Sequence, residues 1–331
     1  MIRKVCTSLL LAAAALAGCG GGDEARDPGP PPLPGPAPQV GAPLAIGGSP
    51  AAVAAGEGGV WIADNLRGRL IRVDPGDSRV AGRAPAGQGP LAVATGDGAV
   101  WVASADGTVR RFDASTGAPT GLPEKVPGAA GVAVGEGGVW VTSQSGGTVT
   151  RLDPSTGRKS AEPVKVGPEP TDIAVGGGAV WVANSGQRNG SVSRIDPETL
   201  KADKPIKVVE GQVLALTYGE GGVWVAGTGL GRGDRIEVLQ LDPSSSAVEG
   251  ALVRLDRSGL PVRLAAGGGS VWVAQGGMEP GTLVRLDPKE RRRLGAPARL
   301  AGAPTGVAVG EGAVWVSSGG RGSLVRAELS R

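Results

Sequence analysis

Seven near-copies of one short motif run through the chain, and each copy contains a tryptophan. The motif reads VGEGGVWV at Val134 to Val141, and successive tryptophans are 40, 39, 41, 43, 48 and 43 residues apart. The seven are Trp61, Trp101, Trp140, Trp181, Trp224, Trp272 and Trp315. A self-similar period near 40 residues indicates a repeat architecture, in which each unit buries its apolar surface against its neighbours.

Each repeat divides into four short stretches that are rich in β-branched residues and bounded by turn residues. In the fourth repeat they read TDIAVG, AVWVAN, SVSRIDPET and KPIKVV. In most repeats a G-E-G or G-D-G lies between the first two stretches, and it suits a hairpin whose central residues take positive φ. The DPSTG or DPETL that follows the third has a proline pre-set for a turn and an aspartate that can cap it. We therefore predict an all-β chain, a seven-bladed β-propeller of four-stranded blades.

The two ends of the repeat region complement each other. The last repeat stops at Arg331 after three strands, while GAPLAIGGSPAAVAAGEGGVW (Gly41 to Trp61) aligns without a gap to GAPARLAGAPTGVAVGEGAVW (Gly295 to Trp315). The start of the first segment is therefore an additional fourth strand. We expect it to pair near Ser323 to Glu328 and to close the ring, which removes two open sheet edges.

Recurrence also indicates what the repeated side chains do. A ligand-binding residue has no need to recur in every blade, whereas a large ring at one place per blade fills the wedge between sheets and buries about 150–250 Å². We expect a structural role for the tryptophans. For the arginines of the third strands we expect paired or solvated positions on the blade, with Gln240 in place of the arginine in blade five. These arginines are Arg72, Arg111, Arg151, Arg194, Arg285 and Arg326.

The N-terminal segment MIRKVCTSLLLAAAALAGC has a cationic start, an apolar run too short to span a bilayer, and small residues at its end, as in an export signal. Its LAGC, Leu16 to Cys19, resembles a bacterial lipobox, which implies cleavage before Cys19 and lipid attachment to its thiol. The alternative is an ordinary secretory signal with a chance cysteine. We predict a signal peptide at 1–18, a Pro/Gly-rich tether at 19–40 and the propeller at 41–331. The mature chain would be an extracytoplasmic, membrane-anchored lipoprotein of the cell envelope.

Composition excludes several functional classes. The formal charge of +3 falls to +1 when Arg3 and Lys4 leave with the signal, so we expect no nucleic-acid partner. The chain has no histidine, and Cys19 would be the one thiol of the mature protein. Ser-His-Asp and Cys-His arrangements and the usual zinc, haem and copper sites are therefore ruled out. We predict no catalytic residue, no metal site and no cofactor, and we expect the acidic hairpin residues at solvated turn tips.

The pattern P-x-x-V-A-V-G-x-G-x-V-W-V-A followed by V-x-R-L-D-P resembles bacterial YVTN/NHL-type propellers, particularly the streptogramin lyase (virginiamycin B lyase)-like group, over about residues 41 to 331. The resemblance implies the propeller fold. Members of the lyase group use a catalytic histidine and a magnesium-binding glutamate, and this chain has no histidine to match. We therefore favour a non-catalytic, monomeric module that binds an envelope protein or a small polar ligand. The alternatives are a lyase that uses carboxylates and a divalent cation, and a purely structural envelope component.

Departures from the repeat locate the candidate site. Of the residues nine positions before each tryptophan, at the start of the first strand, only Asp172 and Arg263 are charged. The others are Ala52, Ala92, Gly131, Ala215 and Gly306. The link between second and third strands is longer in repeats four to six, and Asn184 and Gln275 end second strands on the same side. We predict a polar pocket of Asp172, Arg263, Asn184 and Gln275 beneath the blade-five loop 228–235. Alternatively, Asp172 and Arg263 form an ion pair across the channel or face water.

Overall fold

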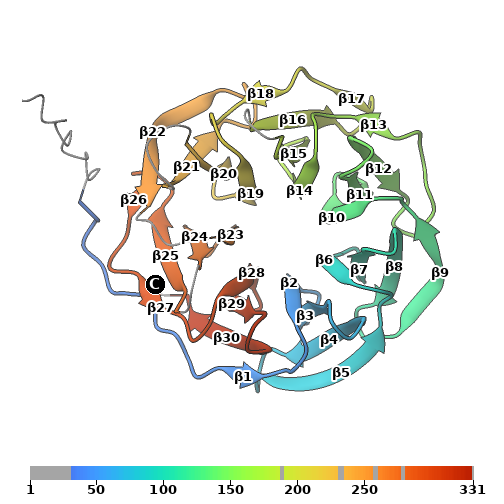
Figure 1. The fold of residues 1–331 in the computed structure, drawn as a ribbon, viewed down its shortest axis with the longest axis horizontal. Helices are drawn as coiled ribbons and strands as arrows, with labels where there is room; N and C mark the ends of the chain where they lie inside the picture. The colour runs from blue at the N-terminus through green and yellow to red at the C-terminus, as the bar shows by residue number, and fades with distance from the viewer. Residues whose placement is uncertain (1–30, 187–189, 230–234, 256–259, 277–279, 330–331) are drawn as a thin grey trace, which may run out of the picture.

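A computed structural model describes residues 31–186, 190–229, 235–255, 260–276 and 280–329. These residues form thirty β-strands and no helix. The strands make seven antiparallel sheets arranged around a central axis as the blades of a propeller (Figure 1). The predicted fold class is confirmed. Residues 1–30, which include Cys19 and the whole predicted signal peptide, lie outside the described part of the chain.

Each blade runs outward from a first, innermost strand to a fourth, outermost one. Blade one comprises β2 (Pro50–Gly56), β3 (Gly59–Asp64), β4 (Arg69–Asp74) and β5 (Arg79–Pro85). Blade two comprises β6 (Pro90–Gly96), β7 (Ala99–Ser104), β8 (Thr108–Asp113) and β9 (Pro119–Lys125). Blade three comprises β10 (Ala129–Gly135), β11 (Gly138–Ser143), β12 (Thr148–Leu152) and β13 (Val164–Lys165). Blade four comprises β14 (Pro170–Val175), β15 (Val180–Asn184), β16 (Ser191–Asp196) and two short outer strands that both pair with β16, namely β17 (Lys201–Ala202) and β18 (Ile206–Lys207). Blade five comprises β19 (Val213–Gly219), β20 (Gly222–Thr228), β21 (Ile236–Leu241) and β22 (Val248–Leu255). Blade six comprises β23 (Val262–Gly267), β24 (Ser270–Gln275), β25 (Thr282–Asp287) and two short outer strands that both pair with β25, namely β26 (Arg292–Arg293) and β27 (Ala298–Arg299). Blade seven comprises β28 (Pro304–Gly310), β29 (Ala313–Ser318), β30 (Ser323–Glu328) and the N-terminal β1 (Leu44–Ala45).

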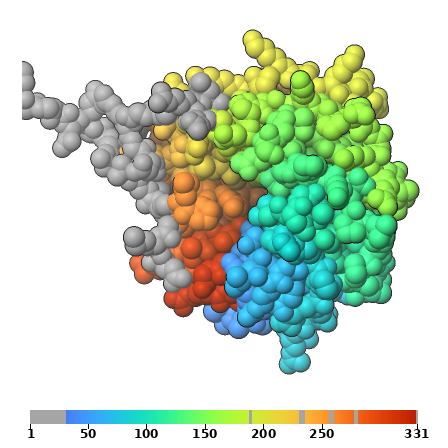
Figure 2. Space-filling view, turned by 45° about the vertical axis from the view of Figure 1, so that its right-hand side comes forward, coloured from blue at the N-terminus to red at the C-terminus, as the bar shows by residue number. Residues whose placement is uncertain are grey.

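The N-terminal strand closes the ring as predicted. In β1, Leu44 pairs with Leu324 and Ala45 with Ser323 of β30, and an isolated bridge joins Val40 to Ala327 of the same strand. Blade one therefore lies directly against blade seven at the molecular surface, where the blue and red ends of the chain meet (Figure 2). Backbone pairing of β1 with β30 thus joins the two ends of the propeller, because the chain continues from β1 directly into β2 of blade one.

The segment before β1 corrects the prediction of a tether that extends to residue 40. Leu33 makes a parallel bridge with Leu294. Its backbone N–H donates to the carbonyl of Arg293 (2.7 Å), and its carbonyl accepts from the N–H of Gly295 (3.0 Å). Because the outer edge of blade six offers unpaired backbone groups, an extended segment that passes beside it finds hydrogen-bond partners there. The described residues 31–40 thus pack along the edges of blades six and seven.

The tryptophans fill the wedges between blades, as expected. All seven are at most 1% exposed. The indole N–H of Trp61 donates to the carbonyl of Gly56 (3.2 Å), and five other blades repeat this bond. The recurrent arginines have a more specific role than the sequence indicated, because each guanidinium stacks on the tryptophan of its own blade, 5.3–5.9 Å from the ring. In blade five the amide oxygen of Gln240 instead accepts from Nε of Arg291 of blade six (2.8 Å).

The turns that join first to second strands take the predicted conformation. Glu57, Asp97, Glu136, Glu220 and Glu311 all have φ between 46° and 55°, and the glycine after each also has positive φ. Three of these side chains do more than face solvent. Oε1 of Glu311, Glu136 and Glu220 accepts from the turn N–H of Gly58, Gly178 and Gly269 respectively, each at 3.0 Å in the following blade. These glutamates therefore link neighbouring blades.

The aspartates after the third strands cap their turns. Oδ1 of Asp153 accepts from the backbone N–H of Ser155 (3.0 Å) and of Thr156 (2.7 Å). The hydroxyl of Ser155, followed by the backbone and hydroxyl of Thr156, lowers the pKa of Asp153 to about 2. Hydrogen bonds from the equivalent turn residues lower the pKa values of Asp113 and Asp242 to about 2 in the same way.

Candidate functional site: the mouth of the central channel

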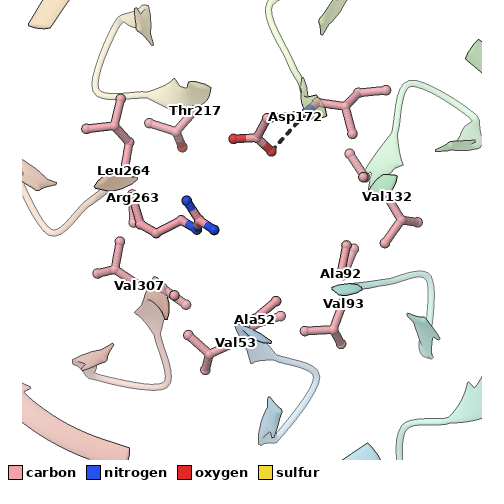
Figure 3. A pocket seen from close by; sticks show the side chains of 18 of the residues that line it. Ala52, Val53, Ala92, Val93, Val132, Asp172, Thr217, Arg263, Leu264 and Val307 are labelled. Atoms are coloured by element: carbon pink, nitrogen blue, oxygen red, sulfur yellow. Dashed lines mark hydrogen bonds between the residues drawn. The ribbon is translucent and has the colours of Figure 1, made fainter. Parts of the chain in front are cut away.

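The seven innermost strands surround the central axis (Figure 1). Their side chains line a channel of about 550 Å³ on this axis (Figure 3). It is lined by alanine, valine, leucine, isoleucine, glycine, threonine and serine, and by two charged residues, Asp172 and Arg263. A hollow of this size accommodates a small molecule. The two charged residues that the sequence singled out therefore do lie in one cavity.

Asp172 and Arg263 lie at the same level of the propeller, two blades apart. Asp172 pairs with Ala183 in β15, and Arg263 pairs with Ala274 in β24, in both cases the residue two positions after the tryptophan. Ala52, Ala92, Ala215 and Gly306 have the equivalent pairings in their own blades. Small residues suit this level because neighbouring inner strands approach closely: a Cβ on Gly306 would lie 2.9 Å from the backbone nitrogen of Val53 in the next blade.

The Asp172 carboxylate joins blade four to blade five. Its Oδ2 accepts from the backbone N–H of Leu216 in β19 (3.0 Å), and its Oδ1 accepts from the N–H of Ile173 (2.9 Å). Burial raises the pKa of this carboxyl, against the opposing effects of the Leu216 N–H, the positive charge of Arg263 and the Ile173 N–H. Asp172 is thus an acid with a raised pKa at the wall of the channel.

The Arg263 guanidinium joins blade six to blade seven. Its Nε donates to the carbonyl of Thr305 in β28 (2.9 Å), and its Nη1 donates to the carbonyl of Val262 (2.9 Å). Figure 3 shows the guanidinium extending into the opening while the Asp172 carboxylate faces the same opening from the other side. The two side chains are not in contact, because no ion pair within 4 Å joins them among the described residues.

Asn184 and Gln275 do not join this pair, which corrects the prediction of a four-residue pocket. They are 0% and 4% exposed, and neither lines the channel. Nδ2 of Asn184 donates to the hydroxyls of Ser191 (3.2 Å) and Ser193 (3.0 Å) inside blade four. The last residue of a second strand is covered by the segment that enters its own blade from the preceding one, since Ser104 and Ser143 at the equivalent positions donate to the carbonyls of Ala86 and Pro127. A polar residue here therefore serves the interior of the blade.

Sequence reasoning missed the hydroxyl groups around the charged pair. Thr171, Ser185, Thr217 and Thr305 line the channel. The hydroxyls of Thr171 and Ser185 are 2.8 Å apart, and the Ser185 hydroxyl donates to the carbonyl of Val213 (2.6 Å). Thr171 and Thr305 directly precede the mouth residues of their strands, a position that is apolar in the other blades, so this departure from the repeat was readable in the sequence.

The prediction also placed the blade-five loop 228–235 over the pocket, and it expected no metal site. Residues 230–234 of the blade-five loop are outside the described chain, so the loop is not placed over the channel. Within the described ranges, no group of three or more His, Cys, Asp or Glu side chains is arranged to hold a metal ion. The same ranges contain no helix with the length and apolar character needed to cross a bilayer.

Comparisons with known proteins support the fold and no single activity. No family model matches the chain, and no curated protein matches its sequence. Among solved structures, virginiamycin B lyase from Staphylococcus aureus is 16% identical with a TM-score of 0.67, over 87% of this chain and 99% of that one. Hydrazine synthase from Kuenenia stuttgartiensis is 14% identical with a TM-score of 0.71, over 85% and 95% of the two chains, and the structure of U3-55K is 13% identical with a TM-score of 0.72, over 88% and 99%. At these identities the similarity establishes a shared β-propeller fold, of the type seen in virginiamycin B lyase.

Proposed function

We propose that this protein is a lipid-anchored, extracytoplasmic β-propeller that binds a ligand or a partner protein at the cell envelope. The observation that carries the binding role is the pair of charged residues, Asp172 and Arg263, on opposite sides of an otherwise uncharged channel (Figure 3). A closed scaffold of seven similar blades has no need of charge at this level, since the five equivalent positions hold alanine or glycine. Ligand sites are typically concave and largely apolar, with a few placed polar groups.

The anchored, envelope part of the proposal rests on the N-terminal sequence. Leu16 to Cys19 has the lipobox pattern at the end of an apolar run, and the described chain begins to contact the propeller at about residue 31. The intervening residues are rich in glycine, proline and charge, which favours an exposed spacer. Attachment of two or more acyl chains at Cys19 would hold the propeller stably at a membrane surface.

Two measurements on the full chain test the proposal. Cys19→Ser should move the protein from the membrane fraction to a soluble or uncleaved form, and unchanged fractionation would rule out the anchor. Envelope extracts should then yield a component that binds the wild-type protein and not the Asp172→Asn, Arg263→Gln double variant. Arg299→Gln, at an exposed position of β27, is the control for loss of a positive charge. Equal capture by all three proteins would place the binding surface elsewhere.

A lyase is the second candidate, and the raised pKa of Asp172 is the observation in its favour. A carboxylate whose pKa is raised toward neutrality is suited to act as a general base or acid, and such groups concentrate at active sites. The fold is shared with virginiamycin B lyase. The test is turnover of streptogramin B by the purified full chain with added magnesium: activity lost in Asp172→Asn would support an enzyme, and no turnover by the wild type would exclude this substrate.

A further inference from the structure

The channel holds a positive charge that no side chain in contact with it balances. Arg263 uses Nε and Nη1 on the carbonyls of Thr305 and Val262, which are neutral acceptors. Nη2 has no hydrogen-bond partner among the described residues, and the guanidinium extends into the opening (Figure 3). The two carbonyl bonds fix the plane of the guanidinium, so the free edge is already oriented toward a molecule in the channel.

The surroundings of Arg263 make an anion the fitting partner. Apart from Asp172, the described lining contains no ionisable side chain. A charge surrounded by apolar groups is costly unless it is paired and hydrogen-bonded. Hydrogen bonds between a guanidinium and a carboxylate are about twice as strong as those between neutral groups, and they take a planar, two-bond geometry. The free edge of Arg263 should therefore form stronger hydrogen bonds with a carboxylate than with a neutral molecule.

The rest of the channel determines what the anion can carry. The same opening is lined by Ala52, Val53, Ala92, Val93 and Val307, which present methyl groups to it (Figure 3). These favour an apolar body on the ligand. Asp172 faces the opening from the other side and, when ionised, repels a second negative charge. The channel is therefore suited to one negative charge, at the Arg263 side.

We propose that the channel binds small organic monocarboxylates, with the carboxylate held by Arg263 and an apolar body packed against the alanine and valine side chains of the inner strands. This deepens the proposed binding role and rests on it for its biological setting only. Asp172 acts as the selectivity element that disfavours dicarboxylates. Neutral amides of the same shape bind less well because they lack the charge that Arg263 recognises.

Calorimetric titration of the purified full chain with three probes tests this assignment. Benzoate carries one carboxylate on an apolar ring, benzamide is its neutral counterpart, and terephthalate adds a second carboxylate. We expect saturable benzoate binding that is at least about tenfold tighter than that of either other probe. Arg263→Gln should weaken benzoate binding by at least about tenfold, Arg263→Lys should weaken it less, and Arg299→Gln should leave it unchanged. Asp172→Asn should improve terephthalate binding more than benzoate binding.

Several results would overturn the assignment. These are no saturable binding of benzoate by the wild type, equal binding of benzamide, or unchanged benzoate binding in a folded Arg263→Gln. Melting curves of each variant establish that it is folded, and Arg263→Lys keeps the test valid if Arg263→Gln is not. The experiment is independent of the envelope role, because benzoate binding by a protein that fails to fractionate with membranes would retain the channel site and reject the anchor.

Discussion

The two faces of the propeller follow different rules. On one face, which we call the turn face, the links between first and second strands have a positive-φ residue that is acidic in five blades and glycine in blades four and six. The links between third and fourth strands on this face begin with aspartates that accept from the next backbone N–H groups. On the other face, the mouth face, the residues nine positions before each tryptophan differ between blades, and two of them, Asp172 and Arg263, are charged. Repetition marks what every blade needs in order to fold. Variation marks what a single blade contributes to the channel.

The hydrogen bond between a third-strand side chain and the turn of the next blade is made in two different ways. In blades one and three, the third-strand arginine reaches the turn of the next blade: Arg72 donates to the carbonyl of Ser115 (2.5 Å) and Arg151 to that of Pro197 (3.5 Å). Between blades five and six the donor lies on the other side, since Arg291 of the blade-six turn donates to Gln240 and pairs with Glu249 (2.7 Å). The contact between blades is kept while the residue that supplies it changes.

The largest expected effect comes from breaking ring closure. Deletion of residues 41–48 removes β1, which leaves the outer edge of β30 unpaired, and it also removes Ile46, a core residue that is 2% exposed in the intact protein. We expect a loss of several kcal/mol in the free energy of unfolding, measured by denaturant titration. Deletion of residues 20–30 is the control and should change little. Equal losses in the two deletions would show that the N-terminal strand does not close the ring.

A single wedge residue comes next. Trp140→Ala removes a ring that is 0% exposed and also leaves Arg151 without its aromatic partner. We expect the free energy of unfolding to fall by about 3–5 kcal/mol. Because the wedge recurs, Trp272→Ala should cost a similar amount. Strongly unequal losses would contradict the view that the blades are structurally equivalent at this position.

The mouth residues should show small effects on stability and large effects on binding. Asp172→Asn and Arg263→Gln each weaken a hydrogen bond to the next blade, so we expect about 1 kcal/mol of destabilisation from each. The two changes should be nearly additive, because they act on different pairs of blades. Denaturant titration of the single and double variants checks this, and a loss comparable to that of Trp140→Ala would make the pair structural.

The smallest effect distinguishes the two faces by the sign of their pH dependence. The folded pKa of Asp153 is depressed to about 2, so its contribution to stability is present above the unfolded pKa of 3.8 and is lost as pH falls toward 2. The folded pKa of Asp172 is raised, so its contribution is fully present below 3.8 and is lost as pH rises through the raised value. Relative to wild type, Asp153→Asn should therefore become less stable as pH rises from 2 to 5.

Asp172→Asn should show the opposite trend, becoming more stable relative to wild type as pH rises from 3 to 7. Thermal melts of both variants and the wild type across this range provide the comparison. The same slope for both variants would mean that Asp172 is ionised as easily as the turn aspartates, and its position in the channel wall would then have no electrostatic consequence.

The fold was predictable because its determinants are local and repeated. Gly-flanked acidic turns, Asp-Pro turns and one tryptophan per unit each specify a short-range conformation, and seven copies made the pattern visible without any long-range information. The closing strand was visible for the same reason, as a segment that aligned with the fourth strand of another repeat. The docking of residues 31–40 was not, because a Pro-rich segment shows no strand pattern and acquires partners only where a blade edge happens to pass.

The site was predictable in part. Sequence position by itself placed Asp172 and Arg263 at the level of the channel, since a residue's distance from its tryptophan determines its height on the strand. The sequence position of a residue does not determine where its side chain points. For this reason the same argument misplaced Asn184 and Gln275, whose side chains are buried inside their blades beneath the segment that enters the blade. Only the tertiary structure decided which polar groups face the channel and which donors remain free, because those properties depend on the backbone of a neighbouring blade more than 40 residues away along the chain.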